Sequence, residues 1–317
     1  MEIYKSEDGK VTKYIHTDGS ETAIKTVSSC NNIIDSSTNS IITEEMDKEK
    51  FSVFMSSSVG CPLKCSFCHL TINNHPYVKL TEAQLLSNFK EALLHKISEE
   101  PALRKRYIKL SWMGMGDAFL RDPYDVRMTS LRMLRYAVGD IGIQGIDGVD
   151  ISTIMPTCKG WQHQLGSLDD DLRRFKMNPN NPSGRSRVRL FYSLVSTTDR
   201  KGLIPAGADI AVDLKTLNAF NLWYNIDVIT HNLILKDFVS MSAFDIKHTV
   251  GMLNRFLPSA EFRILRYNKS DKSNLTESRD FVKIASEYSK RLKKVKVQTS
   301  QGEDVKASCG MFMCKHS

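Results

Sequence analysis

The sequence has no run of about 18 apolar residues, the length that an ordinary transmembrane helix needs, so we expect no membrane association. The first eight residues contain no apolar core, and we therefore expect no secretory signal. Internal repeats and long low-complexity stretches are also missing, and charged residues make up 25% of the chain, which argues against a disordered tail or a fibre. These absences predict a soluble, cytoplasmic protein.

The cysteines show no sign of a disulfide framework. Their number, seven, is odd, and no export signal precedes them. Three of the seven fall within eight residues, and this crowding is the most informative feature of the chain. The cysteines are Cys30, Cys61, Cys65, Cys68, Cys158, Cys309 and Cys314.

The chain is long enough for a sizeable core, and its cations are clustered. It has 317 residues, of which 41% are hydrophobic, enough for one large domain or two modest ones. Lys and Arg number 44 against 36 Asp and Glu, a net charge of +8. Clustered cations suit a polyanion such as RNA, although solvated helix ends and loops are an alternative for each cluster. The clusters cover residues 104–106, 173–176, 185–189 and 290–296.

Turn signals divide the chain into two parts. Residues 1–28 alternate in polarity around Asp8-Gly9 and Asp18-Gly19, a pattern typical of short strands joined by tight turns. Residues 29–49 are rich in Ser, Asn and Thr, which predicts a loop or linker. We therefore expect a small strand-rich segment with a linker over residues 1–49, and the main domain over 50–317.

Strand and helix patterns alternate through the main domain. About six such repeats predict right-handed crossovers and a parallel sheet of the α/β class, either open or curled into a partial barrel. The strand-like runs begin near Phe51, Tyr107, Val149, Val188, Ile226 and Glu261, with a last short strand at 294–299. Helical patterns cover 81–98, 123–137, 160–175, 211–223, 242–257 and 277–291.

Cys61, Cys65 and Cys68 have the spacing C-x3-C-x2-C in a loop just after the first of these strands. Thiolates this close together bind a soft metal or an iron–sulfur cluster. Two alternatives stay open: a structural zinc site with His69 as fourth ligand, and three unrelated buried thiols. Three cysteines on a four-iron cluster would leave one iron available to another molecule.

Polar and glycine motifs follow the other strands. Met113-Gly114-Met115-Gly116-Asp117 comes after the second run and Ser152 after the third; Ser193-Leu194-Val195 ends the fourth, and Asn268 follows the sixth. Each is weak alone. Because functional groups in barrels of parallel strands gather at the carboxyl ends of the strands, their joint placement indicates one site.

The cysteine loop resembles that of the radical S-adenosylmethionine (SAM) superfamily. The segments 59–68, 113–117 and 304–310 more closely resemble the RlmN/Cfr family, which methylates adenine in 23S ribosomal RNA and in some cases tRNA. The resemblance covers roughly residues 6–313. It implies a partial (β/α)6 TIM-like barrel, with the small strand-rich segment before it, and RNA as the substrate.

The resemblance also implies roles for single residues. Cys61, Cys65 and Cys68 would hold a [4Fe-4S] cluster, and Cys309 would receive a methyl group from one SAM molecule. A radical made from a second SAM, with an electron from a flavodoxin-type donor, would take a hydrogen from that methyl group, and the carbon radical would add to adenine. The SAM site would be lined by Gly116, Asp117, Ser152, Ser193, Leu194, Val195 and Asn268.

Several positions depart from the family pattern. Asp117 stands where the family has Glu, and Val195 stands where it has His. Phe54 replaces a second catalytic cysteine, and Lys25 replaces a glutamate. The methyl-cysteine half of the reaction is thereby retained, while release of the product needs another group. Cys314 is the first candidate for it, and Cys30 and Cys158 are weaker ones.

Two further functions remain open from the sequence. The first is a diverged radical SAM enzyme with another substrate or outcome, which Lys25 and Phe54 favour. The second is a metal-stabilised nucleic-acid-binding protein without catalysis.

Overall fold

The structure is a computed structural model that describes residues 1–26, 31–35, 40–43, 49–175, 188–197, 200–207, 209–224, 226–235, 243–268, 272–298 and 301–307. Its centre is a 12-stranded mixed sheet with the order β1-β2-β3-β6-β9-β10-β11-β12-β13-β14-β4-β5. A two-stranded sheet of β7 (Ser58–Val59) and β8 (Val78–Lys79) lies beside it.

The middle of the sheet is parallel, as the sequence predicts. Each strand from β6 to β14 in this order pairs in parallel with the next. Within the described residues the order has two ends, β1 and β5, so the sheet is not closed. The strands are β6 (Lys50–Met55), β9 (Tyr107–Trp112), β10 (Gly145–Thr153), β11 (Val188–Val195), β12 (Asp227–Leu233), β13 (Glu261–Leu265) and β14 (Val295–Gln298).

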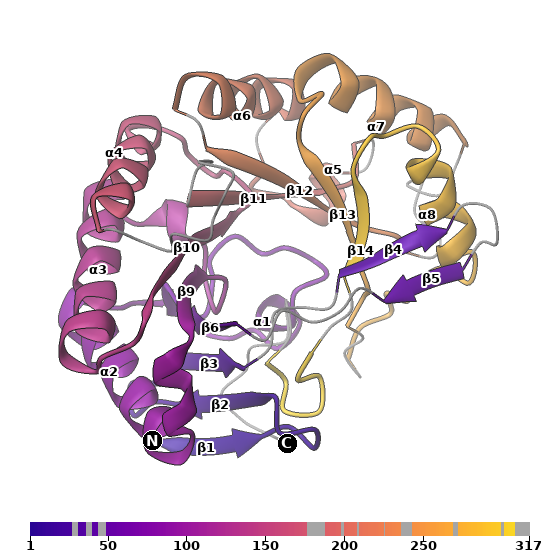
Figure 1. Cartoon of the computed structure of the whole chain (residues 1–317). Helices are drawn as coiled ribbons and strands as arrows, with labels where there is room; N and C mark the ends of the chain where they lie inside the picture. The colour runs from indigo at the N-terminus through magenta and orange to yellow at the C-terminus, as the bar shows by residue number, and fades with distance from the viewer. Residues whose placement is uncertain are drawn as a thin grey trace.

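The long helices form an outer arc around the strands (Figure 1). They are α2 (Glu82–Glu99), α3 (Pro123–Arg135), α4 (Trp161–Arg174), α6 (Ile210–Tyr224), α7 (Ala243–Phe256) and α8 (Phe281–Ser289). Shorter turns are α1 (His69–Ile72), α5 (Arg200–Leu203), η1 (Pro101–Lys105), η2 (Ala118–Leu120) and η3 (Tyr136–Asp140).

Local capping signals set the starts of α2 and α3. Thr81 and Gln84 form a capping box at α2. Asp122 caps α3, whose first residue is Pro123. The alternating helices and strands predicted from the sequence are thus confirmed, with α8 starting four residues later than expected.

The N-terminal strands extend the same sheet. β1 (Glu2–Lys5), β2 (Val11–Ile15) and β3 (Glu21–Lys25) form an antiparallel series, and β3 pairs with β6. The turns between them use Gly9 and Gly19, at φ +68° and +82°, as the Asp-Gly signals predict. The first 26 residues are therefore continuous with the main sheet.

β4 (Asn31–Asp35) and β5 (Ser40–Thr43) stand where the sequence analysis predicts a loop. The two strands pair with each other, and β4 pairs with the edge of β14, with Asn32 opposite Val297. This pairing is made by backbone groups of a distant strand, so local composition does not predict it.

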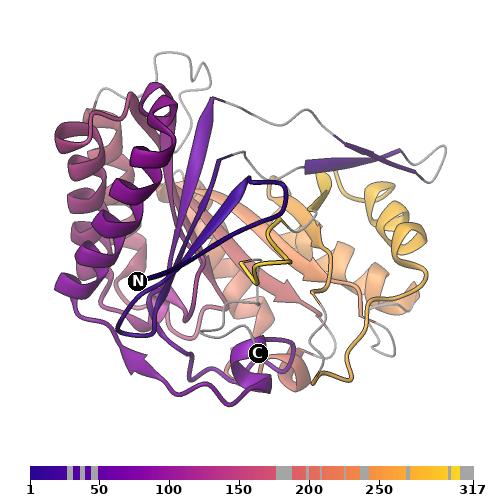
Figure 2. The ribbon, with the colours of Figure 1, turned by 90° about the horizontal axis from the view of Figure 1, so that it is seen from below.

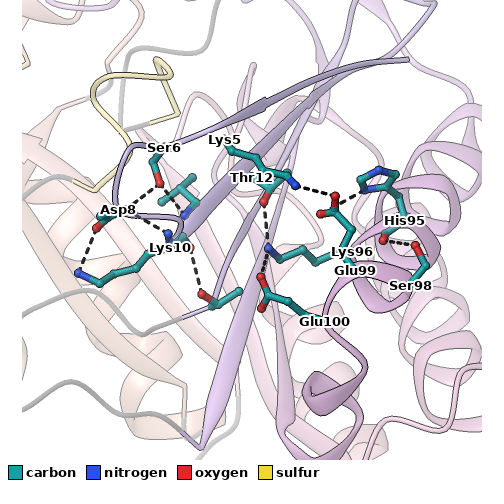
Figure 3. Close-up of polar contacts among 12 residues, drawn as sticks. Lys5, Ser6, Asp8, Lys10, Thr12, His95, Lys96, Ser98, Glu99 and Glu100 are labelled. Atoms are coloured by element: carbon teal, nitrogen blue, oxygen red, sulfur yellow. Dashed lines mark hydrogen bonds and ion pairs between the residues drawn. The ribbon is translucent and has the colours of Figure 1, made fainter.

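Side-chain contacts attach α2 to the hairpin of β1 and β2 (Figure 3). The buried Lys96 ammonium group donates to Thr12 Oγ1 at 3.1 Å and pairs with Glu100 at 2.5 Å. Lys5 on β1 pairs with Glu99 at 2.6 Å. These contacts hold the N-terminal strands to the outer layer.

The segment 301–307 returns to the N-terminal strands; in Figures 1 and 2 it is the yellow trace beside the indigo strands. Its Val305 and Ala307 pack with Val11 and Ala23 in one apolar cluster.

Among the described residues, no helix combines the length and apolarity required to cross a membrane.

Candidate active site

A cavity lies at the carboxyl ends of the parallel strands. Trp112, Thr153, Leu265 and Gln298 are the last residues of β9, β10, β13 and β14, and all four line it. The thiol-bearing residues Cys61, Cys65 and Cys68 line the same cavity. The placement of one site at this edge of the sheet agrees with the rule for parallel barrels.

The cysteine loop has a fixed backbone. Gly60 has φ +62°, and a Cβ there would lie 2.1 Å from the Pro76 carbonyl oxygen, so only glycine fits. The Ser66 amide donates to the Leu203 carbonyl at 3.0 Å, and the Cys68 amide donates to the Cys65 carbonyl at 3.1 Å. These contacts hold the loop against α5 and the start of α1.

Burial disfavours the ionised form of all three thiols. It raises the pKa of Cys61 to about 12, and it raises the pKa values of Cys65 and Cys68 as well. Thiols in this environment ionise when a metal centre supplies the compensating positive charge.

The donor set fits an iron–sulfur cluster better than a single ion. In the described part of the chain, no three His, Cys, Asp or Glu side chains are placed to hold one metal ion. The ring Nε2 of His69 lies 3.1 Å from the Asn268 carbonyl oxygen. Metal-bound histidines often make such a contact through the other ring nitrogen, so this bond does not decide between the cluster and the zinc site with His69 as fourth ligand. On a four-iron cluster each thiolate binds a different iron, and the sulfurs need not converge.

The glycine box packs against three serines that precede the cysteine loop. A Cβ on Gly114 would lie 2.7 Å from the Ser56 amide nitrogen, and one on Gly116 would lie 2.1 Å from Ser58 Oγ. The Ser57 amide donates to the Met115 carbonyl at 2.8 Å. The glycines therefore permit close approach of two backbones, and Gly116 also lines the cavity.

Asp117 connects the ends of two strands. Its carboxylate accepts hydrogen bonds from the Phe119 amide at 2.8 Å, the Ile154 amide at 2.9 Å and Thr153 Oγ1 at 3.1 Å. Burial raises its pKa to about 6. Both oxygens of the carboxylate thus accept structural hydrogen bonds, Oδ1 from Phe119 and Oδ2 from Ile154 and Thr153, and the residue also lines the cavity.

The remaining cofactor candidates divide into two groups. Ser152 and Ser193 line the cavity. Leu194 is fully buried in the main core, and Val195, at φ +61°, packs beside Cys61 and Cys65. Leu194, Val195 and Asn268 are not among the residues that line the cavity, although the Asn268 carbonyl contacts His69.

Arg200 is a positioning residue that the sequence analysis misses. Its guanidinium group donates to the carbonyls of Ser193, Leu194 and Ile154 at 2.6, 2.7 and 3.1 Å. It also pairs with Asp213 at 3.7 Å. The guanidinium group thereby joins the ends of β10 and β11. No local sequence pattern around Arg200 predicts this role.

Lys25 and Phe54, two of the four positions that depart from the family pattern, both line the cavity. Lys25 on β3 and Phe54 on β6 lie on the same face, and the Lys25 ammonium group stands 4.9 Å from the centre of the Phe54 ring. The same ammonium group donates to the Gln301 carbonyl at 3.0 Å. A carboxylate does occur on β3, but Glu21 is fully buried and pairs with Lys13 at 3.0 Å.

The cysteines proposed for methyl transfer and release lie outside the described residues. This holds for Cys309, Cys314 and Cys30. The described segment that precedes Cys309 ends at Ala307, which lines the cavity. Cys158 packs against the main core instead.

The basic clusters do not all face solvent. Arg189, counted with residues 185–189, lies on β11 and bonds to Asp150 at 2.5 Å and to Asp147 at 3.0 Å. Its inclusion among surface cations was therefore wrong, because strand alternation turns it toward these carboxylates. Lys293 and Lys294 of the last cluster are exposed.

No protein-family model matches the chain, and no curated protein matches its sequence. Among solved structures it is similar to a radical SAM methyltransferase from Sphaerobacter thermophilus, with 18% sequence identity and a TM-score of 0.67. The match covers 99% of this chain and 81% of that one. The two proteins share a fold. The expected α/β class with a parallel sheet is thereby confirmed, whereas the partial (β/α)6 barrel and membership of the RlmN/Cfr family stay predictions.

Proposed function

We propose that the protein is a radical SAM enzyme. The observation that carries the proposal is that three cysteines of one short loop line a cavity at the carboxyl ends of parallel strands, in a fold shared with a radical SAM methyltransferase. We interpret the open arc of strands and helices as the partial (β/α)6 barrel of that superfamily, in a cytoplasmic protein.

In this proposal Cys61, Cys65 and Cys68 hold a [4Fe-4S] cluster, and SAM binds beside it. A bound cluster, reduced by a flavodoxin-type donor, would supply the electron for reductive cleavage of SAM and so the hydrogen-abstracting radical. Gly116 allows close approach, Asp117 accepts a hydrogen bond from the cofactor's amino group, and Ser152 and Ser193 supply further polar contacts.

The proposed substrate is adenine in RNA, either rRNA or tRNA. Cys309 would take a methyl group from SAM by displacement at its sulfonium, with S-adenosylhomocysteine as the leaving group. That methyl group would then lose a hydrogen atom to the radical made from a second SAM, and the resulting carbon radical would add to the ring. A tethered carbon avoids a bimolecular encounter, which explains the use of a cysteine carrier. The segment before Cys309 supports this role because Ala307 lines the cavity.

Release of the methylated base requires removal of a ring proton, and the phenyl ring of Phe54 cannot accept one. Cys314 is the proposed acceptor. The placement of Lys25 and Phe54 in the cavity favours one second candidate, a radical SAM enzyme with another substrate or another outcome. A structural metal protein without catalysis receives no such support.

RNA binding is proposed for the exposed part of the last basic cluster. Lys293 and Lys294 are exposed, and neutralising phosphates with such residues makes affinity depend steeply on salt. Charge reversal of both lysines should weaken RNA binding and flatten the salt dependence. Unchanged affinity would remove this cluster from the RNA interface.

The test begins with anaerobic purification. The proposal expects a brown protein with about four irons and four sulfides per chain that cleaves SAM when reduced. Zinc in place of iron, or no SAM cleavage, would refute the enzyme class.

Mass spectrometry then separates the two candidate outcomes. A methyl group on Cys309 and on adenine of treated RNA supports adenine methylation. SAM cleavage with neither product supports the second candidate.

The role of Phe54 is tested on a denaturing gel with labelled RNA. Phe54→Cys should lower the amount of protein–RNA adduct, and Cys314→Ala should raise it. If Cys314→Ala changes nothing in an enzyme that turns over many times, Cys314 is not the acceptor.

A further inference from the structure

Two polar atoms in the cavity wall are buried without a hydrogen-bond partner in the described part of the chain: His231 Nε2 and Gln298 Oε1. Both residues line the cavity, and His231 is only 6% exposed. An unpartnered buried polar atom destabilises a fold, so either a bound ligand or an ordered water satisfies it. Neither residue has a role in the site described above.

Strand register brings the two residues to one face. His231 lies opposite Ser193 of β11 on one side and Arg263 of β13 on the other. Gln298 lies opposite Leu265, two residues further along β13 than Arg263. Because side chains alternate along strands, His231, Leu265 and Gln298 share the inner surface of neighbouring strands.

The charge state of the pair limits the ligand. Burial and the neighbouring Arg263 lower the pKa of His231 to about 3, so its imidazole is neutral. The Gln298 amide is neutral as well. Two uncharged planar groups that donate and accept hydrogen bonds suit an uncharged planar ring with both donors and acceptors on its edge.

Aromatic side chains complete the same cavity. Phe54, Phe67 and Trp112 line it. Proteins that act on single nucleobases hold them by stacking on aromatic rings and by hydrogen bonds to the base edge. An amide side chain pairs well with the adjacent amino group and ring nitrogen of adenine.

We propose that His231 and Gln298 form the hydrogen-bonding edge of a nucleobase subsite that takes the adenine of the substrate. This inference rests on the proposed function, whose substrate it places. Adenine also occurs in SAM, and the position of Gln298 favours the substrate. Gln298 ends β14, three residues before the segment 301–307 that leads to Cys309.

The test uses His231→Leu and Gln298→Met in the iron-loaded full chain, with adenosine and inosine as probes in calorimetric titrations. Each variant should bind adenosine about tenfold more weakly or worse, and the preference for adenosine over inosine should shrink toward one in Gln298→Met. Each should also melt about 2 °C higher or more without ligand, because a buried unpartnered atom is removed.

The expected decrease in adenosine affinity together with the expected increase in melting temperature distinguishes a binding role from a structural one. Lower melting temperatures with unchanged adenosine affinity would overturn the proposal. Gln144→Met is the matched control, since Gln144 is exposed and bonds to Tyr107 at 3.1 Å, before the start of β10. It should change neither quantity.

Titration with SAM separates the two sources of adenine. A loss of SAM affinity equal to the loss of adenosine affinity would assign the pair to the cofactor and refute the substrate subsite. Wild-type protein that does not bind adenosine would also refute it. Iron content and SAM cleavage test the proposed function independently, because adenosine binding needs no reduced cluster.

Discussion

Replacement of Lys25 by Met should loosen the segment that leads to Cys309. Lys25 is buried, with only 9% of the residue exposed. Its ammonium group donates to the Gln301 carbonyl at 3.0 Å and stands 4.9 Å from the Phe54 ring centre. Methionine keeps the apolar stem and removes both polar contacts.

The structure allows an estimate of the effect. A hydrogen bond from a charged group contributes about 1.5–3 kcal/mol, and a cation over an aromatic ring adds about 0.5–2 kcal/mol. Relief of the cost of burying the ammonium group offsets part of this sum. A net loss of about 2 kcal/mol would raise the population of the detached segment about 30-fold.

Hydrogen exchange measures this opening directly. The Ala307 amide donates to the Gly302 carbonyl at 2.8 Å and should exchange about 30-fold faster in Lys25→Met, while amides of β12 serve as the internal reference. Lys5→Met is the matched control, because Lys5 is exposed and pairs with Glu99 on α2. Equal protection of Ala307 in wild type and Lys25→Met would show that the contact to Gln301 does not hold the segment.

Three further predictions follow from the site and the fold. Cys68→Ala should lose most of its iron during purification, while the control Cys158→Ala should retain it. Iron analysis of both purified variants is the measurement, and full iron content in Cys68→Ala would show that Cys68 is not a ligand. Because the pKa of Asp117 is raised to about 6, its carboxyl gains a proton as the pH falls from about 8 to about 5. SAM affinity should then fall with a midpoint near pH 6, and a calorimetric profile that is flat with pH would contradict a contact between Asp117 and SAM. The stability contributed by this group runs the other way: it is greatest at low pH and is lost as the pH rises through about 6. Lys13→Met should lower stability by about 3–5 kcal/mol in urea unfolding, and adding Glu21→Leu should restore most of it; equal stability of the two variants would mean that the buried pair is not coupled.

The sequence by itself determined the features that depend on local pattern. The cysteine spacing, the Asp-Gly turns and the alternation of strands and helices can each be recognised from a few neighbouring residues. The structure has the predicted parallel strands, with the cysteine loop after β6. The resemblance to radical SAM proteins came from the same short motifs, and the shared fold agrees with it.

Only the tertiary structure decided which side chains meet. Lys25 reaches Gln301 across 276 positions, Arg200 joins the ends of two strands, and His231 and Gln298 face one cavity from β12 and β14. Arg189 turned inward although its neighbours in sequence suggested a surface cluster. A strand's neighbours and the direction of each side chain follow from long-range pairing and register, which local composition does not encode.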